Sequence, residues 1–323
     1  MPVDGQILEP GSGALPVPVL IADHGEDAWR RFIEFFTAQI RNANTRKAYG
    51  RAVADFFGWC ERHEIGPLID IEPVHIAAWV EDRGRKVSAP TVKQNLAAVR
   101  HLFDWLVSGG VLPGNPATSV RGPKHVVRKG KTPILNAKEA RKLLDSLPTD
   151  KIAGLRDRAL IALMTYSFAR IGAAVAMDVK DVFHQHGRLW VRLHEKGGKP
   201  HAMPCHHNLE RYLLDYIEAA GIGKDRDTPL FRSIDRKTKA LSGRRLQATE
   251  SWYMVRRRGK QAGISTEICN HTFRGTGITA YLENEGQLEK AAQMAAHSST
   301  RTTQLYDRRD DEVTQDEVER IVI

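Results

Sequence analysis

The chain has 323 residues, of which 41% are hydrophobic and 27% are charged. This composition is ordinary for a globular protein and excludes wholesale disorder, and the length suffices for two domains with a core each. The formal net charge of +9 predicts an acidic partner. Nucleic acid is the commonest specific partner of so basic a chain, and a merely solvated surface is the alternative. An anionic membrane ranks third, because no basic amphipathic helix with an aromatic or leucine face stands out.

The three cysteines, Cys60, Cys205 and Cys269, lie far apart without metal-ligand spacing. Such a sparse set favours a reducing compartment over a disulfide framework. The first residues show no basic segment followed by an apolar run, so no signal peptide is predicted. No apolar stretch approaches the length of a membrane span. We therefore expect a cytoplasmic protein with no membrane association.

Residues 1–25 are rich in proline and glycine and predict a flexible arm. A helical DNA-binding domain is predicted over 26–112, because apolar residues recur at spacings of three and four. The expected helices lie near 27–36, 53–60, 74–82 and 92–106. Basic helix faces are often only solvated, but several in one small domain favour DNA. The expected contacts are Arg46, Lys47, Arg51, Lys93 and Arg100.

A basic linker is predicted over 113–133. This stretch has four prolines, three glycines, five lysines and arginines, and no acidic residue. It cannot bury a core, and its cations suit a phosphate backbone. The expected DNA contacts are Arg121, Lys124, Arg128, Lys129 and Lys131.

The remaining residues, 134–323, predict a second domain that is mainly helical. It opens with Asn136 as a helix N-cap and Glu139 three residues on, a capping box. The expected helices lie near 137–147, 155–168, 207–220, 246–262, 272–285 and 287–296. Between them, Leu189, Val191 and Leu193 alternate and predict a β-strand. A turn at 196–199 and a return over 202–205 complete a hairpin, so the fold class is mainly α with a small antiparallel sheet.

His271 and Arg274 are the first candidates for chemistry. Three residues apart on a helix, both can grip one anionic group. The pair alone is weak evidence, since about one such pair is expected by chance in this chain. His297 and Tyr306 follow further along. In one unbroken helix they would face opposite ways, but Ser298 and Ser299 offer an N-cap and therefore a break that re-aims them.

Arg170 follows an apolar helix, and Lys196 stands in the predicted hairpin turn. In chain order the candidates are Arg170, Lys196, His271, Arg274, His297 and Tyr306. This arrangement resembles the active site of the tyrosine recombinase (integrase) family, which has Arg, Lys, His-x-x-Arg, His and Tyr in that order. The resemblance covers nearly the whole chain, as a helical core-binding domain, a basic linker and a catalytic domain. The stretches 271–281 and 297–306 are its most specific parts.

The resemblance implies a reaction in which Tyr306 attacks a DNA phosphate and forms a covalent 3′-phosphotyrosine intermediate. Arg170 and Arg274 would stabilise the phosphate charge bidentately, and His271 and His297 would position oxygens or handle the tyrosine proton. Lys196 would protonate the leaving 5′ oxygen, with Lys199 as the competing lysine. Because the phosphotyrosine keeps the bond energy, we expect no cofactor, neither ATP nor a metal. The alternative is that Tyr306 is only a structural tyrosine of the core, in which case Tyr281 is the next candidate for the nucleophile.

The sequence departs from the family pattern at three places. The family usually has an acidic residue three after the first arginine, where this chain has Ala173. It usually has Thr-Gly where this chain has Ser167-Phe168, and glycine where Ala296 precedes the second histidine.

Family members work on double-stranded DNA with paired core half-sites, as a dimer on each site and a tetramer on two sites, through a Holliday junction. We expect the same here, with the need for an accessory DNA-binding protein left open. Arg256 and Arg257 are expected backbone contacts or solvated side chains. The tail has a capping box at Thr314–Glu317 and an apolar cluster over 318–323, which packs on its own domain or docks into a neighbouring protomer.

Two other functions remain open. One is a type IB-like DNA-relaxing enzyme, against which an intermolecular tail helix argues. The other is a non-catalytic DNA-binding regulator, which would not need Tyr306. Because the N-terminal arm is short, we expect a simple core-site recombinase of a mobile element such as a transposon, or of a plasmid or chromosome, rather than an integrase with a separate arm-binding domain.

Overall fold

The computed structural model describes residues 6–9, 12–126, 130–195, 200–235, 237–308 and 318–321. These fall into two compact units, one ending at Val126 and one following it. The finer predicted limits, at 26–112, 113–133 and 134–323, stay predictions. None of the helices in the described ranges combines the length and apolar character that crossing a bilayer requires.

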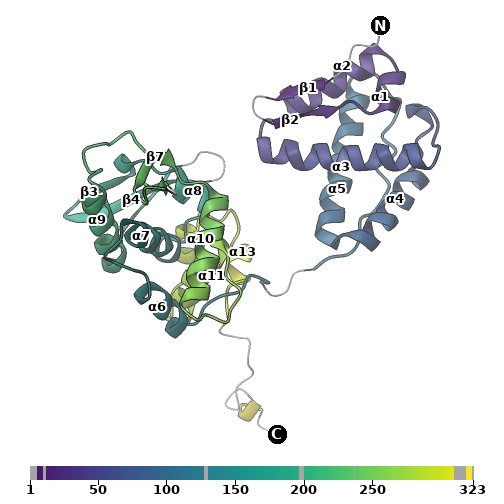
Figure 1. Cartoon of the computed structure of the whole chain (residues 1–323). Coiled ribbons are helices and arrows are strands. Elements are labelled where there is room, and N and C mark those ends of the chain that lie inside the picture. The colour runs from purple at the N-terminus through teal and green to yellow at the C-terminus, as the bar shows by residue number, and fades with distance from the viewer. Residues whose placement is uncertain are drawn as a thin grey trace. The chain divides into compact units, whose positions relative to one another are not determined.

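The first unit is a bundle of helices preceded by a small hairpin (Figure 1). Its elements are β1 (Gln6–Glu9), β2 (Ser12–Pro16), α1 (Val19–Asp23), α2 (Glu26–Glu34), the π-helix η1 (Phe35–Gln39), α3 (Ala43–Arg62), the 3-10 helix η2 (Leu68–Asp70), α4 (Pro73–Lys86) and α5 (Ala89–Ser108). The four predicted helices are confirmed. The strands and α1 lie where the sequence predicts an arm, and Ile21 of α1 is buried in the core of the bundle.

Aromatic side chains dominate this core. Phe56 of α3 makes edge contacts with Trp79 of α4 and Phe103 of α5, at ring-centroid distances of 5.1 and 6.0 Å. The indole N–H of Trp79 donates to Asp55 over 2.9 Å, so its one polar atom is satisfied inside the core. Asn42 caps α3 by accepting from the backbone N–H groups of Asn44 and Thr45, as expected for an N-terminal asparagine.

The second unit combines helices with a three-stranded antiparallel sheet in the order β3-β4-β5. Its helices are α6 (Ala137–Asp145), α7 (Ile152–Tyr166), α8 (Ile171–Ala176), the 3-10 helix η3 (Val179–Asp181), α9 (His207–Ala220), α10 (Ala248–Gln261), α11 (Asn270–Glu283), α12 (Leu288–Met294) and α13 (Thr300–Gln304). Its strands are β3 (Val182–Gln185), β4 (Arg188–His194), β5 (Pro200–Pro204), and the separate pair β6 (Arg232–Ile234) and β7 (Leu241–Arg245). The fold class, mainly helical with small antiparallel sheets, is confirmed.

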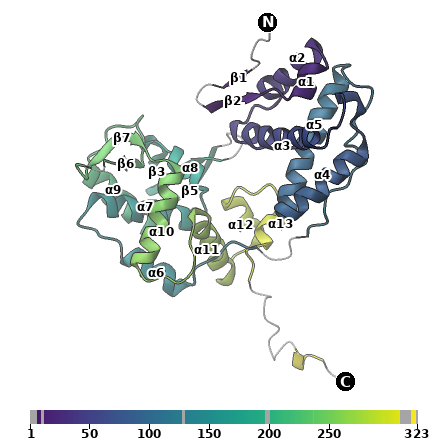
Figure 2. The ribbon, with the colours of Figure 1, turned by 45° about the vertical axis from the view of Figure 1, so that its right-hand side comes forward.

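The helix α7 forms the centre of this unit. Its residues from Ala159 to Met164 are all buried, as expected of a helix that is apolar on every side. It packs against α9 on one flank and α11 on another. The helices α11, α12 and α13 are packed in sequence (Figure 2). His271 and Arg274 lie on α11, whereas His297 lies between α12 and α13 and Tyr306 follows α13. The helix α11, which carries two of the candidate residues, is therefore packed directly against the central helix α7.

Candidate active site

Tyr306 and His271 are in direct contact. The Nε2 atom of His271 lies 2.6 Å from the hydroxyl of Tyr306. The Tyr306 backbone is anchored as well, because its carbonyl accepts from the hydroxyl of the buried Thr279 over 2.8 Å. A Cβ atom added to Gly275 would lie 3.3 Å from the Tyr306 ring, so the ring packs closely on the backbone of α11. The predicted helical placement of His271 and Arg274, one turn apart on α11, is confirmed.

Arg274 is almost completely buried and fixed by backbone carbonyls. One terminal nitrogen donates to the carbonyl of Phe168. The other donates to the carbonyl of Ala295 and to Nε2 of His297, each over 2.6 Å. Its Nε atom is buried without a hydrogen-bond partner among the described residues. A buried donor without a partner is unfavourable, so the two terminal nitrogens and their acceptors must hold the guanidinium in place.

A residue in a left-handed backbone conformation lies at each of these carbonyls: Phe168 supplies one itself, and Ala296 directly follows Ala295, which supplies the other. Phe168 has φ +53° and Ala296 has φ +46°. Both stand where the family usually has glycine, the residue that enters this region at least cost. The Phe168 side chain is buried against Ile278 and Leu282, which offsets the strain. The backbone shape that holds Arg274 is therefore kept without glycine.

His297 is held between Arg274 and Thr303. Its Nδ1 atom lies 2.8 Å from the hydroxyl of Thr303, and its ring is nearly parallel to that of Tyr306, with centroids 6.3 Å apart. The predicted break in the helix is confirmed, because Ser299 caps α13 by accepting from the backbone of Arg301. This break allows His297 and Tyr306 to face one point.

Burial and positive charge set the protonation of the site. Burial lowers the pKa of His271, and the charges of Arg274 and Arg170 lower it further. The same causes lower the pKa of His297 to about 4. Burial raises the pKa of Tyr306, and the charges of the two arginines and a hydrogen bond with Thr132 offset part of that rise. At neutral pH both histidines are therefore neutral and the phenol keeps its proton.

Arg170 stands at the N-terminus of α8 and forms an ion pair with Glu195, which follows β4. Phe168, two residues before Arg170, accepts from Arg274 through its carbonyl, so Arg170 lies beside the same site. Lys196 and Lys199, the two lysines between which the sequence left a choice, lie outside the described residues. The structure thus brings together five of the six predicted candidates.

Sequence reasoning missed Glu195, Thr303 and the Phe168 carbonyl. One signal for Glu195 was present: Leu189, Val191 and Leu193 point to the buried side of β4, and the same alternation continues to residue 195. The role of the Phe168 carbonyl, by contrast, could not be predicted, because every residue type has the same backbone carbonyl.

The predicted DNA contacts fall into distinct groups. Arg100 is partly buried and donates to the carbonyls of Ala117 and Val120, and Arg46 donates to the carbonyl of Ile40. Arg256 pairs with Glu267 over 2.7 Å. Arg128 and Lys129 lie outside the described residues. The exposed members are Lys47, Arg51, Lys93, Arg121, Lys124, Lys131, Arg256 and Arg257.

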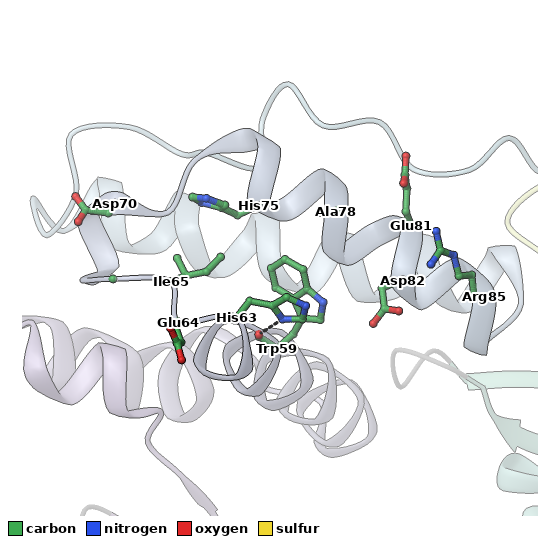
Figure 3. A pocket seen from close by; sticks show the side chains of 11 residues that line it. Trp59, His63, Glu64, Ile65, Asp70, His75, Ala78, Glu81, Asp82 and Arg85 are labelled. Carbon is green, nitrogen blue, oxygen red and sulfur yellow. Dashed lines mark hydrogen bonds between the residues drawn. The ribbon is translucent and has the colours of Figure 1, made fainter.

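The first unit contains a separate open pocket of about 600 Å³ between the end of α3 and α4. Figure 3 shows the rings of Trp59 and His63 stacked at its floor, with Asp82 and Arg85 along α4. Its carboxylates do not form a metal site, since no group of three or more His, Cys, Asp or Glu side chains in the described ranges is placed to bind one. The contacts among His271, Arg274, His297 and Tyr306 lie in the second unit.

Comparison with known proteins agrees with this geometry. Residues 133–312 match the Phage integrase family, and residues 30–110 match the phage integrase N-terminal SAM-like domain. The tyrosine recombinase XerC of Salmonella typhi is 28% identical over 227 residues, which cover 70% of this chain and 72% of that protein.

Solved structures show the same fold. The XerH site-specific recombinase bound to a palindromic difH substrate, a post-cleavage complex, has a TM-score of 0.69 and 18% identity, covering 91% of this chain and 83% of that one. A lambda integrase dimer bound to a COC′ core site has a TM-score of 0.67 and 18% identity, covering 88% of this chain and 96% of that one. Because the Phage integrase match alone spans more than half of the sequence, the chain belongs to the tyrosine recombinase (phage integrase) family, whose members break and rejoin DNA.

Proposed function

We propose that this recombinase cuts DNA at a specific site with Tyr306 as its nucleophile. The observation that carries the proposal is the 2.6 Å contact between the Tyr306 hydroxyl and His271 Nε2. A phenol with a raised pKa needs a base to lose its proton during attack, and a neutral imidazole at hydrogen-bond distance is such a base. The positive charge of the two arginines beside it suits a phosphodiester.

In the proposed first step, the Tyr306 oxygen attacks the phosphorus of a DNA phosphodiester. The phenol proton passes to Nε2 of His271, and the bond between phosphorus and the 5′ oxygen breaks. Arg274 and Arg170 stabilise the charge on the non-bridging oxygens. The 5′ oxygen takes a proton from Lys196, an assignment that rests on the family resemblance.

The second step reverses the first with another strand. A 5′ hydroxyl gives its proton to Lys196 and attacks the 3′-phosphotyrosine. The new phosphodiester forms, and the Tyr306 oxygen recovers its proton from His271. Every bond broken in cleavage is thus remade in joining, so the exchange needs no energy input beyond the phosphotyrosine itself.

We propose the assembly from the relatives. Lambda integrase has been solved as a dimer on a core site and as a tetramer on a Holliday junction. We propose that this chain also binds paired half-sites as a dimer, and exchanges strands in a tetramer through a Holliday junction, in the cytoplasm. Val318 and Ile321 in the tail are 53% and 69% exposed, so this apolar segment has surface to bury against a neighbour.

The cleavage step is tested by trapping. DNA that becomes covalently attached to the protein in cells would be sequenced to recover the site, and a nicked suicide duplex would be built on it. The wild type should form a covalent adduct, Tyr306→Phe should bind the duplex without an adduct, and Tyr281→Phe should behave like the wild type. An adduct that persists in Tyr306→Phe, or fails only in Tyr281→Phe, would refute the assignment.

The assembly is tested by ending the chain after Arg309. If the tail docks into a neighbour, the truncated protein should keep its melting temperature and bind one half-site, while cooperative binding of paired half-sites disappears. A lower melting temperature with cooperativity intact would show that the tail packs on its own domain and would contradict the proposal.

A further inference from the structure

The ion pair between Arg170 and Glu195 joins two elements of the second unit. Arg170 is the N-cap of α8, and Glu195 directly follows the last residue of β4. The helix α8 packs against β4, which brings the two side chains together. A terminal nitrogen of Arg170 donates to Oε2 of Glu195.

The two partners differ sharply in burial. The Glu195 side chain is 5% exposed, whereas that of Arg170 is 35% exposed. A carboxylate at this depth is unfavourable unless a cation neutralises it. The arginine, by contrast, keeps an open face toward solvent, where a phosphate can reach it. Glu195 therefore holds Arg170 from the buried side, and the exposed side of the Arg170 guanidinium remains free to bind a phosphate.

The position three residues after the first arginine usually carries an acidic residue in this family, but here it carries an alanine. Ala173, three residues after Arg170, is 6% exposed and packs in the apolar core. A carboxylate is nevertheless beside Arg170, delivered from the end of β4 instead of from α8. We infer that Glu195 is a positioning residue, which orients the Arg170 guanidinium toward the scissile phosphate and replaces the acid that is absent at residue 173.

The inference rests on the proposed function and adds a requirement to it. An arginine that clamps a phosphate bidentately must hold its planar group at a fixed angle. A charge-assisted hydrogen bond from one nitrogen fixes that angle and leaves the other donors for the ligand. Without Glu195 the guanidinium keeps its charge but not its orientation, so phosphate binding survives better than cleavage does.

The test uses the full chain and the suicide duplex described above. Glu195→Gln keeps the shape of the side chain and removes its charge, and Glu267→Gln removes one exposed carboxylate of the same unit as a control. We expect adduct formation by Glu195→Gln to slow by roughly 10- to 100-fold, since small misplacements of catalytic groups cost rates of that order. Binding of the uncleaved duplex in a gel shift should be unchanged or tighter, and Glu267→Gln should cleave like the wild type.

A double-mutant cycle, followed by melting temperature, provides a second measurement. Arg170→Ala leaves the buried Glu195 without its cation and should lower the melting temperature, and adding Glu195→Gln should restore most of that decrease. Two results would overturn the inference: unchanged or faster cleavage by Glu195→Gln, or a change in melting temperature in the double variant that equals the sum of the two single changes. The proposed function would stand in either case, provided that the wild type forms its adduct at Tyr306. If the wild type forms no adduct, the proposed function fails, and the inference fails with it.

Discussion

The hydroxyl of Thr303 lies 2.8 Å from Nδ1 of His297, while the other ring nitrogen faces Arg274 at 2.6 Å. A guanidinium can only donate, so Nε2 of the neutral histidine must accept. The ring proton is therefore on Nδ1 and donates to Thr303. Arg274 thus selects the tautomer of His297, and the fully buried hydroxyl of Thr303 accepts the ring proton.

This relationship predicts different outcomes for two substitutions of Thr303. Thr303→Ser keeps the hydroxyl and should retain adduct formation near the wild-type rate. Thr303→Val leaves a ring N–H buried without a partner, which costs about 1–3 kcal/mol, and should slow cleavage as well. Rates on the suicide duplex and denaturant unfolding of both variants test this. Equal rates and stabilities for the serine and valine variants would show that the hydroxyl does not matter.

The lowered pKa values of the histidines predict a particular pH dependence. His271 accepts a proton only when neutral, so cleavage should persist as the pH falls through 6.5, the ordinary value, and decline only below it. The pKa of His297 is lowered to about 4 in the folded protein. Between 6.5 and about 4 the unfolded chain binds this proton and the folded chain does not, so its contribution to stability is complete above 6.5 and is lost as the pH falls through that window.

Melting curves across this range check the second part. His297→Gln should flatten the decrease in stability on acidification, whereas the exposed His184→Gln should leave it as in the wild type. Identical pH dependence in the wild type and His297→Gln would contradict the assignment.

The left-handed conformation of Ala296 predicts that a glycine there stabilises the protein. Its φ of +46° is strained for alanine and free for glycine. Relief of roughly 1–2 kcal/mol of strain should exceed the greater entropy of the unfolded glycine chain, roughly 0.4–1 kcal/mol. Ala296→Gly should therefore raise the free energy of unfolding slightly, and the neighbouring Ala295→Gly, at φ −79°, should lower it. Destabilisation by both glycines would show that Ala296 is not strained.

Much of the fold could be predicted because the apolar spacing is regular. Helices α3, α5, α7 and α11 follow from it, and the capping box at Asn136 was confirmed. The short elements α8, β6 and β7 were missed, since they bury too few residues to show a period. The order of the candidate residue types predicted side chains that the structure brings together, but it could not reveal that Arg274 is held by the carbonyls of Phe168 and Ala295. Those hydrogen bonds depend on backbone conformation, which many side chains can adopt once tertiary packing offsets the strain.

The linker cations predict a change in salt dependence. Arg121, Lys124 and Lys131 are exposed, so neutralising them together should weaken binding to specific and unrelated duplexes alike. The slope of log affinity against log salt should fall by about 0.9 for each phosphate that the variant no longer neutralises. Arg100→Gln is the matched control: because Arg100 holds the carbonyls of Ala117 and Val120, it should lower stability by about 1–3 kcal/mol with a smaller effect on the slope. An unchanged slope in the triple variant would mean that these side chains are only solvated.

The most direct test of the account is to identify the residue that carries the DNA. The wild-type adduct would be digested with protease and nuclease, and the peptide that bears a nucleotide would be sequenced by mass spectrometry. We predict a nucleotide joined through its 3′ phosphate to Tyr306, the residue 2.6 Å from His271. A nucleotide on Tyr281 or on any other residue, or one joined through a 5′ phosphate, would contradict the central claim.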